Sequence, residues 1–138
     1  MNLDFLPEKI FSSIKQLDIN SIYEIRLRVG FSIFCITNKG REILKENGQD
    51  IVCSYNDISF IIEKITKRSI YAYNNQIKKG FLDAGNGIRV GLGGECVFDD
   101  NKILTIRNIS SLNIRLPHYI KDCSKKVINY IIFNNIIS

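Results

Sequence analysis

Five of the seven arginines lie in strand-like segments, and they are the side chains of this sequence best suited to bind an anion. Arg26 and Arg28 alternate with apolar residues in one segment, and Arg89, Arg107 and Arg115 each lie in a later one. A planar guanidinium can grip a phosphate or a carboxylate through two parallel N–H bonds. The same arginines could instead form surface salt bridges, which add little to stability. The sequence alone leaves both interpretations open.

The sequence does not predict a metal site or an acid–base catalytic pair. Its one histidine is His118, and its cysteines, which are far apart and form no C-x-x-C motif, are Cys35, Cys53, Cys96 and Cys123. Structural zinc sites usually draw paired ligands from short loops, so this pattern does not fit one. Nucleophilic catalysis needs a base within reach of the nucleophile, and no G-x-S-x-G motif accompanies the histidine. We therefore expect no catalytic residue and no metal in this chain.

Glycines cluster at positions 85–87 and 91–94, and their pattern favours turns and bulges over a nucleotide-binding loop. A G-x-G-x-x-G motif stands between a strand and a helix, whereas strands follow both glycine groups here. The phosphate-binding motif G-x-x-x-x-G-K-[ST] is absent from the 138 residues. We expect the glycines to serve the backbone at turns and bulges.

The elements that position the arginines are predicted by hydrophobic periodicity. Residues 23–29 alternate strictly, which predicts a strand with its apolar side chains, beginning with Tyr23, in the core and its three charges on the opposite face. A hairpin is expected over 33–44, followed by a polar loop at 46–50. A short strand could follow at 51–53. In the second half we expect separate short strands at 81–84, 88–92, 97–98, 104–107 and 112–116.

Helices are predicted between these strands. Pro7 at a first-turn position opens one that runs to about Leu17, and Ser54 with Asp57 forms a capping box for a second. Two more are expected at 69–79, stopped by Gly80, and from about 121 onward. The last carries an apolar face that ends unfinished at Ser138, which indicates a sequence cut from a longer protein.

Composition fits one α+β domain spanning residues 1–138, with a mixed or antiparallel sheet of about six short strands and packed helices. The chain is 45% hydrophobic and 24% charged, with a net charge of +5. That charge permits an anionic partner without specifying one. No apolar signal peptide opens the chain and no stretch has the length of a membrane span, so we expect a cytoplasmic protein with reduced thiols.

In five segments the chain resembles the stage III sporulation protein AA family of bacterial sporulation ATPases. The segments carry the resemblance by their order and spacing, and they are residues 24–30, 71–73, 80–81, 89–94 and 108–115. The first reads Glu-Ile-Arg-Leu-Arg-Val-Gly and the last Asn-Ile-Ser-Ser-Leu-Asn-Ile-Arg. More loosely, the chain is similar to the N-terminal domains of type II and type IV secretion and pilus-retraction ATPases.

The resemblance implies a PAS-like N-terminal domain joined to a RecA-like ATPase domain that would begin after Ser138. It implies a hexamer, with ATP and magnesium bound by the ATPase domain and none by this chain. At the matching positions, Arg89 and Arg115 are the nucleotide-sensing candidates. Arg26, Arg28 and Arg107 are secondary candidates for an interface.

The same resemblance implies a regulatory or assembly role in a channel between mother cell and forespore. Expected partners are the ATPase domain, neighbouring subunits and membrane proteins of that channel, and the expected place is the mother-cell side of the membrane. This chain alone is then not expected to hydrolyse ATP.

Two other functions stay open from the residues. A nucleic-acid-binding module would use Tyr71, Tyr73 and Phe81 as a stacking platform near Lys78 and Lys79, although core packing of the tyrosines is favoured and a nucleic-acid partner is not expected. A docking scaffold for a membrane protein would need no ligand of its own.

Overall fold

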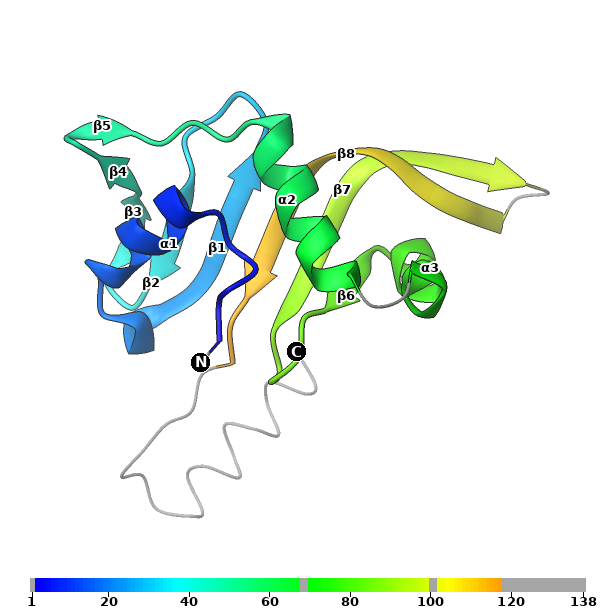
Figure 1. The fold of residues 1–138 in the computed structure, drawn as a ribbon, viewed down its shortest axis with the longest axis horizontal. Helices are drawn as coiled ribbons and strands as arrows, with labels where there is room; N and C mark the ends of the chain where they lie inside the picture. The colour runs from blue at the N-terminus through cyan, green and yellow to red at the C-terminus, as the bar shows by residue number, and fades with distance from the viewer. Residues whose placement is uncertain (1, 68–69, 100–101, 118–138) are drawn as a thin grey trace, which may run out of the picture.

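A six-stranded antiparallel sheet forms the centre of the molecule, as the computed structural model shows (Figure 1). The structure describes residues 2–67, 70–99 and 102–117, without the side chains of 70–72, 74, 96–99 and 102–107. The strands lie in the order β3-β2-β1-β8-β7-β6. Their bounds are β1 Ile22–Arg28, β2 Phe34–Thr37, β3 Gly40–Ile43, β6 Phe81–Asp83, β7 Arg89–Asp99 and β8 Lys102–Arg115. The α+β class and the antiparallel sheet of six strands are confirmed.

The two longest strands correct the sequence prediction, which divided them into short pieces. β7 and β8 pair from Arg89 opposite Arg115 to Asp99 opposite Lys102, and this hairpin extends beyond the rest of the sheet (Figure 1). The pairing passes through an irregularity at Gly93 and Glu95, opposite which Asn108 adopts a φ of 51°. A bulge thus absorbs the residues that looked like breaks, because an extra residue can be left unpaired while the ladder continues.

A small second sheet replaces the polar loop expected at 46–50. Strands β4 (Lys45–Glu46) and β5 (Gln49–Asp50) pair in antiparallel fashion. Asn47 and Gly48 between them have φ of 53° and 80°. Two consecutive residues with positive φ are what a tight hairpin turn requires, so the sequence Asn-Gly was a turn signal that the prediction did not use. The strand expected at 51–53 is reduced to a single bridge between Val52 and Ser32.

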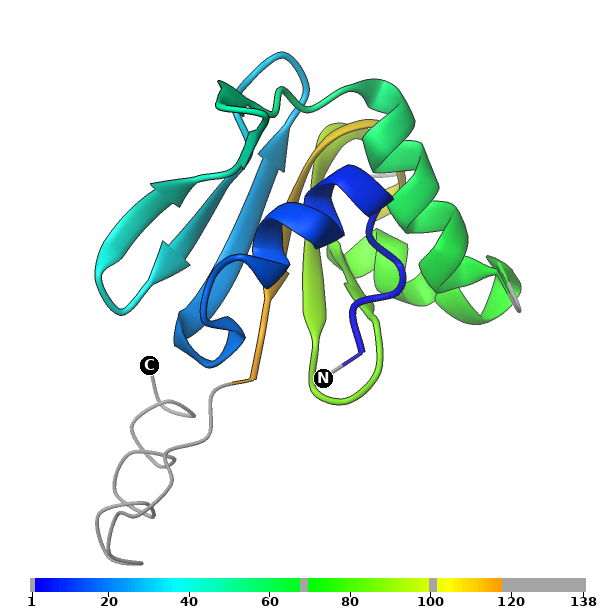
Figure 2. The same cartoon turned by 60° about the vertical axis from the view of Figure 1, so that its left-hand side comes forward.

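Two helices lie over the same face of the sheet, as Figures 1 and 2 show from two sides. Helix α1 spans Glu8–Lys15, shorter than predicted, with Pro7 as its N-cap residue. Helix α2 spans Tyr55–Thr66. The predicted capping box is confirmed: Ser54 Oγ accepts a hydrogen bond from the Asp57 amide, and the Asp57 carboxylate accepts one from the Ser54 amide. Helix α3 spans Ile70–Lys79 and ends at Gly80, whose φ is 87°. The helix expected from 121 lies outside the described residues.

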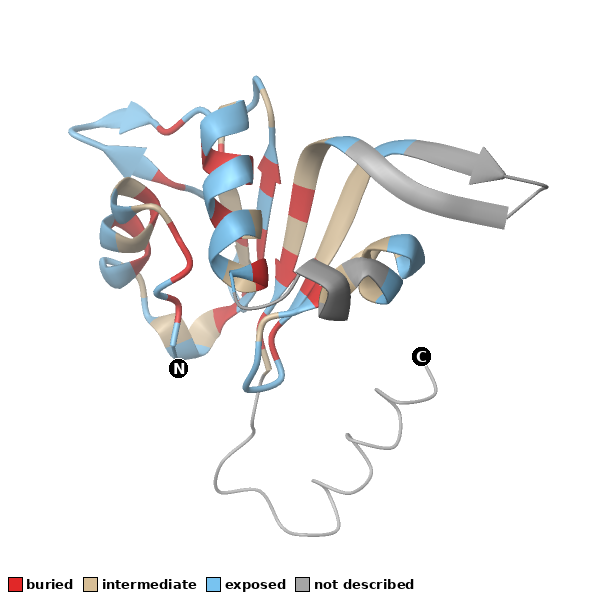
Figure 3. Ribbon diagram, turned by 45° about the vertical axis from the view of Figure 1, so that its right-hand side comes forward, coloured by how far each residue is buried: buried red, intermediate tan, exposed pale blue. Residues whose placement is uncertain are grey.

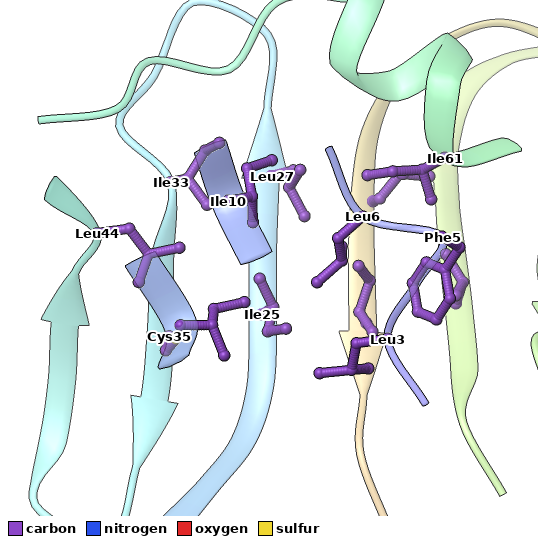
Figure 4. Packing of buried hydrophobic residues seen from close by; sticks show 14 of the residues in the cluster. Leu3, Phe5, Leu6, Ile10, Ile25, Leu27, Ile33, Cys35, Leu44 and Ile61 are labelled. Carbon is purple, nitrogen blue, oxygen red and sulfur yellow. The ribbon is translucent and has the colours of Figure 1, made fainter. Parts of the chain in front are cut away.

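Aliphatic side chains fill the space between the sheet and these helices. Ile10 of α1, Ile61 of α2 and Ile25 of β1 are fully buried, and Figure 4 shows them converging with the segment that precedes α1. Buried and exposed residues alternate along the central strands, as Figure 3 shows. One predicted core residue is wrong: Tyr23 is 38% exposed and Ile22 is buried instead. The pairing of β1 with β2 shifts between Ile22 and Glu24, and this shift reverses the alternation at the start of the strand.

Candidate anion-binding site

The sheet face opposite the buried isoleucines carries arginines in three rows that cross the strands. Strand pairing places the members of each row side by side. The first row reads Arg41, Ile36, Glu24, Arg115, Arg89 and Asp83 from β3 to β6. The second reads Ile43, Phe34, Arg26, Asn113, Gly91 and Phe81. The third reads Arg28, Ser111 and Gly93 across β1, β8 and β7. We call these three rows the open face.

Arg89 and Arg115 are direct cross-strand neighbours in the first row. Like charges opposite each other on adjacent strands repel, so this pair does not help to hold β7 and β8 together. Carboxylates occupy the two flanking positions of the row: Asp83 pairs in register with Arg89, and Glu24 Oε1 accepts a hydrogen bond from Arg115 Nε at 3.1 Å. The Arg115 side chain is still 71% exposed, so its ion pair orients the guanidinium without covering it.

Glu24 connects the first row to the second. Its Oε2 accepts a hydrogen bond from Arg26 Nε at 2.9 Å, while its Oε1 holds Arg115. The Glu24 side chain is only 14% exposed because the two arginines enclose it. The sequence left open whether these arginines form salt bridges or are available to a ligand. Arg26 and Arg115 are ion-paired with Glu24, and both remain accessible to a further anion.

Three other arginines of the open face lie over aromatic rings. The guanidinium carbon of Arg41 is 3.8 Å from the ring centroid of Phe34, that of Arg89 is 4.5 Å from Phe81, and that of Arg28 is 4.6 Å from Phe31. A ring holds a cation through its π face and uses none of the guanidinium N–H groups. Among the described residues, no carboxylate lies within ion-pair distance of Arg28 or Arg41. These charges are therefore held in place with their N–H donors available.

A groove of about 770 Å³ lies over the second and third rows of the open face, and Arg41 of the first row borders it. Arg26, Arg28 and Arg41 line it together with Phe31 and Phe34, and its floor includes Ser111 and Asn113. Two glycines of β7 make the hollow, since Gly91 and Gly93 occupy open-face positions where other residues would place a side chain. A Cβ at Gly93 would come within 2.1 Å of Ser111 Oγ. Besides the backbone role expected for them, these glycines therefore leave the groove floor free of side chains.

The groove floor holds an unusual polar atom. Asn113 Oδ1 is inaccessible to water and has no hydrogen-bond partner among the described residues. Buried acceptors are nearly always paired, because losing water without a replacement costs free energy. This acceptor belongs to the second row, between Arg26 and Gly91. Because no water reaches this atom, it is equally closed to a donor from a ligand in the groove.

The structure brings four of the five predicted arginines onto one face. Arg26 and Arg28 line the groove, and Arg89 and Arg115 lie beside it in the first row. The side chain of Arg107 lies outside the described ones. The prediction missed Arg41, although the alternation within the hairpin 33–44 places it on the same face as Phe34. Asn113 was also missed, because nothing in its sequence context shows that its amide oxygen is left unpaired.

The stacking platform considered for nucleic acid, made of Tyr71, Tyr73 and Phe81, is not formed by the two of these rings that the structure describes. Tyr73 packs against the hydrophobic core cluster. Phe81 lies on the open face, beneath Arg89. The side chain of Tyr71 is not described. The two described rings thus belong to different sides of the sheet and cannot hold successive bases together.

The cysteines with described side chains are buried and poorly suited to chemistry. Burial, with a smaller effect of Glu42, raises the pKa of Cys35 to about 12. Burial also raises the pKa of Cys53 to about 11, with Asp57 adding to the rise. In the described part of the chain, no three His, Cys, Asp or Glu side chains come together as metal ligands would. None of the described helices has the length and apolar character needed to cross a membrane.

The fold and the site define a class before any relative is considered: an α+β domain with one buried sheet face and one accessible face bearing arginines. The family model "Sporulation stage III, protein AA" matches residues 7–138, and the chain belongs to this family. It is 24% identical over 139 residues to stage III sporulation protein AA of Bacillus subtilis (strain 168). That alignment covers 96% of this chain and 42% of the relative, so the chain spans about two-fifths of the relative's length. No solved structure matches the chain.

Proposed function

We propose that this chain is the N-terminal regulatory and assembly domain of a sporulation ATPase, and that it senses nucleotide bound by a neighbouring domain or subunit. Membership of the stage III sporulation protein AA family supports the sporulation role. In this proposal a RecA-like domain follows Ser138, the protein forms a hexamer, and that domain binds ATP with Mg²⁺. The hexamer acts on the mother-cell side of the membrane, on a channel to the forespore whose membrane proteins are its partners.

The observation that carries the proposal is the cross-strand pair of Arg89 and Arg115. The two residues are cross-strand neighbours, with Arg115 bonded to Glu24 on β1 and Arg89 lying over Phe81 on β6. A phosphate bound between them would offset the repulsion of their charges. The Glu24 contact and the Phe81 ring fix the two side chains without removing them from solvent. A phosphate presented from outside the domain can therefore reach both.

In this proposal, the bound nucleotide determines the position of the domain, because ATP binds the closed and open arrangements with different affinity. If the closed arrangement alone brings the arginines to the terminal phosphate, a triphosphate binds this arrangement more tightly than the open one. Hydrolysis removes the contact, and the domain is released. Arginines delivered in this way can also stabilise the charge that develops during phosphoryl transfer.

The test is ATP turnover by a protein that contains this domain and its ATPase domain. We expect Arg89→Ala and Arg115→Ala each to lower turnover by about tenfold or more, while the melting temperature stays close to that of the wild type. The matched control is Lys64→Ala, which removes an exposed cation from α2, outside the open face. Wild-type turnover in both arginine variants would contradict nucleotide sensing by this pair.

A further inference from the structure

We propose that the groove lined by Arg26, Arg28 and Arg41 is a binding site for a small phosphorylated molecule. This site is separate from the pair of Arg89 and Arg115, and the inference does not rest on the proposed function. It requires no second domain, because its three arginines belong to strands of the same sheet.

The charges of the groove call for an anion. Three guanidiniums line one hollow. Among the described residues, one carboxylate forms an ion pair with them: Glu24, in the adjoining row, bonds to Arg26. Arg28 and Arg41 have ring contacts in place of a carboxylate among the described residues. Phosphate balances more of this charge than a carboxylate does, since it carries up to two charges and three acceptor oxygens.

The size and backbone of the groove favour a small molecule over a peptide. Its volume of about 770 Å³ lies within the range of roughly 300–1,000 Å³ typical of small-ligand pockets. The floor consists of strands β1, β8 and β7, whose backbone groups are already paired with one another. An extended peptide on this floor would lose water from its own backbone groups without replacement, because the edge strand β3 lies at the side of the groove and not in its floor.

A second copy of this face is also an unsuitable occupant. Its three rows contain five arginines and two carboxylates, Glu24 and Asp83. Packing two such surfaces together would bring like charges close in a partly dehydrated interface, which is costly. A small anion brings no further positive charge to the face and therefore avoids this repulsion.

Binding to the 138-residue chain, measured by isothermal titration calorimetry at low ionic strength, tests the inference. The probes are ribose 5-phosphate, inorganic phosphate, ribose and a poly-glutamate peptide. We expect saturable binding of ribose 5-phosphate and of inorganic phosphate at one site, and no binding of ribose. Arg28→Gln and Arg41→Gln should each weaken ribose 5-phosphate binding by about tenfold or more. Lys64→Gln, the same charge change on α2, should leave it within about twofold.

The inference is overturned if ribose 5-phosphate does not bind, if Lys64→Gln weakens binding as much as Arg28→Gln does, or if poly-glutamate binds the groove more tightly than the phosphorylated probe. Arg28 and Arg41 are exposed, so melting temperatures of their variants should match the wild type and confirm that the fold is retained.

Discussion

Ile25 and Arg26 are neighbours in β1, and they face opposite sides of the same sheet. Ile25 is fully buried beneath the helices, whereas the Arg26 side chain is 51% exposed on the open face. On the buried side, aliphatic residues from every part of the described chain pack into one cluster. On the open side, arginines lie over single rings or share one carboxylate. One strand thus serves two surfaces built on different physical principles.

The difference teaches which residues the fold needs. Burial of apolar area is the main favourable contribution to folding, so the isoleucines account for the stability of the sheet. Exposed ion pairs and ring contacts contribute little, and the repulsion between Arg89 and Arg115 opposes strand pairing. Stability therefore does not explain the open face, whereas the anion binding proposed above would explain it.

The largest effect should come from truncating the buried member of the neighbouring pair. We expect Ile25→Ala to lower the free energy of unfolding by about 2–5 kcal/mol, because it removes buried methyl groups and leaves a cavity. Arg26→Ala should cost about 1 kcal/mol or less, since it breaks one exposed ion pair. Urea denaturation of the 138-residue chain measures both. A loss in Arg26→Ala as large as that in Ile25→Ala would mean that the open face is packed, and the comparison would fail.

A smaller effect is expected from alkaline pH, through the buried thiol of Cys35. Burial raises its pKa to about 12 from the ordinary value of 9.0, so the folded protein keeps the proton that the unfolded chain releases. This thiol then leaves stability unchanged below pH 9.0. As pH rises from there toward about 12, the free energy of unfolding should fall progressively, because only the unfolded chain releases this proton.

Variants isolate that contribution from other groups that titrate at high pH. Urea midpoints of the wild type and of Cys35→Ala should run parallel below pH 9.0 and diverge above it, with the wild type losing more. Cys53→Ala should reduce the loss as well, though less, because the pKa of Cys53 is raised only to about 11. A Cys35→Ala variant with an undiminished alkaline loss would show that this thiol is not shielded by the core.

Much of this arrangement could be predicted from sequence because local patterns decide it. Strict alternation in β1 placed Arg26 and Arg28 on one face, and the Ser54–Asp57 spacing placed the start of α2. The resemblance to the family directed attention to Arg89 and Arg115, which the sheet then set side by side. Alternation fails where pairing slips by one residue, and Tyr23 was misplaced for that reason.

The groove could not be predicted, because it depends on the order of the strands. Arg41 comes from β3 and Asn113 from β8, and only the pairing of β1 with both β2 and β8 brings their rows into one surface. The glycines were interpreted as turns and bulges, which agrees with the irregularity next to Gly93 but does not reveal that Gly93 lies opposite Ser111. Sequence patterns report which face a residue occupies, and tertiary pairing decides what lies beside it.

The smallest effect on stability, and the most informative about the open face, should come from Glu24→Gln. Glutamine keeps the shape of the side chain but has a single acceptor oxygen, so it keeps the hydrogen bond from Arg26 or from Arg115 and loses the other. Since both arginines are exposed, we expect the free energy of unfolding to change by about 1 kcal/mol or less. Removing the charge makes the face more positive, and the 138-residue chain should bind pyrophosphate more tightly and with a steeper dependence on salt. Glu63→Gln, the same change on α2, should alter neither property. Weaker pyrophosphate binding in Glu24→Gln would mean that the carboxylate serves mainly to orient the two guanidiniums, and that their geometry matters more than their number.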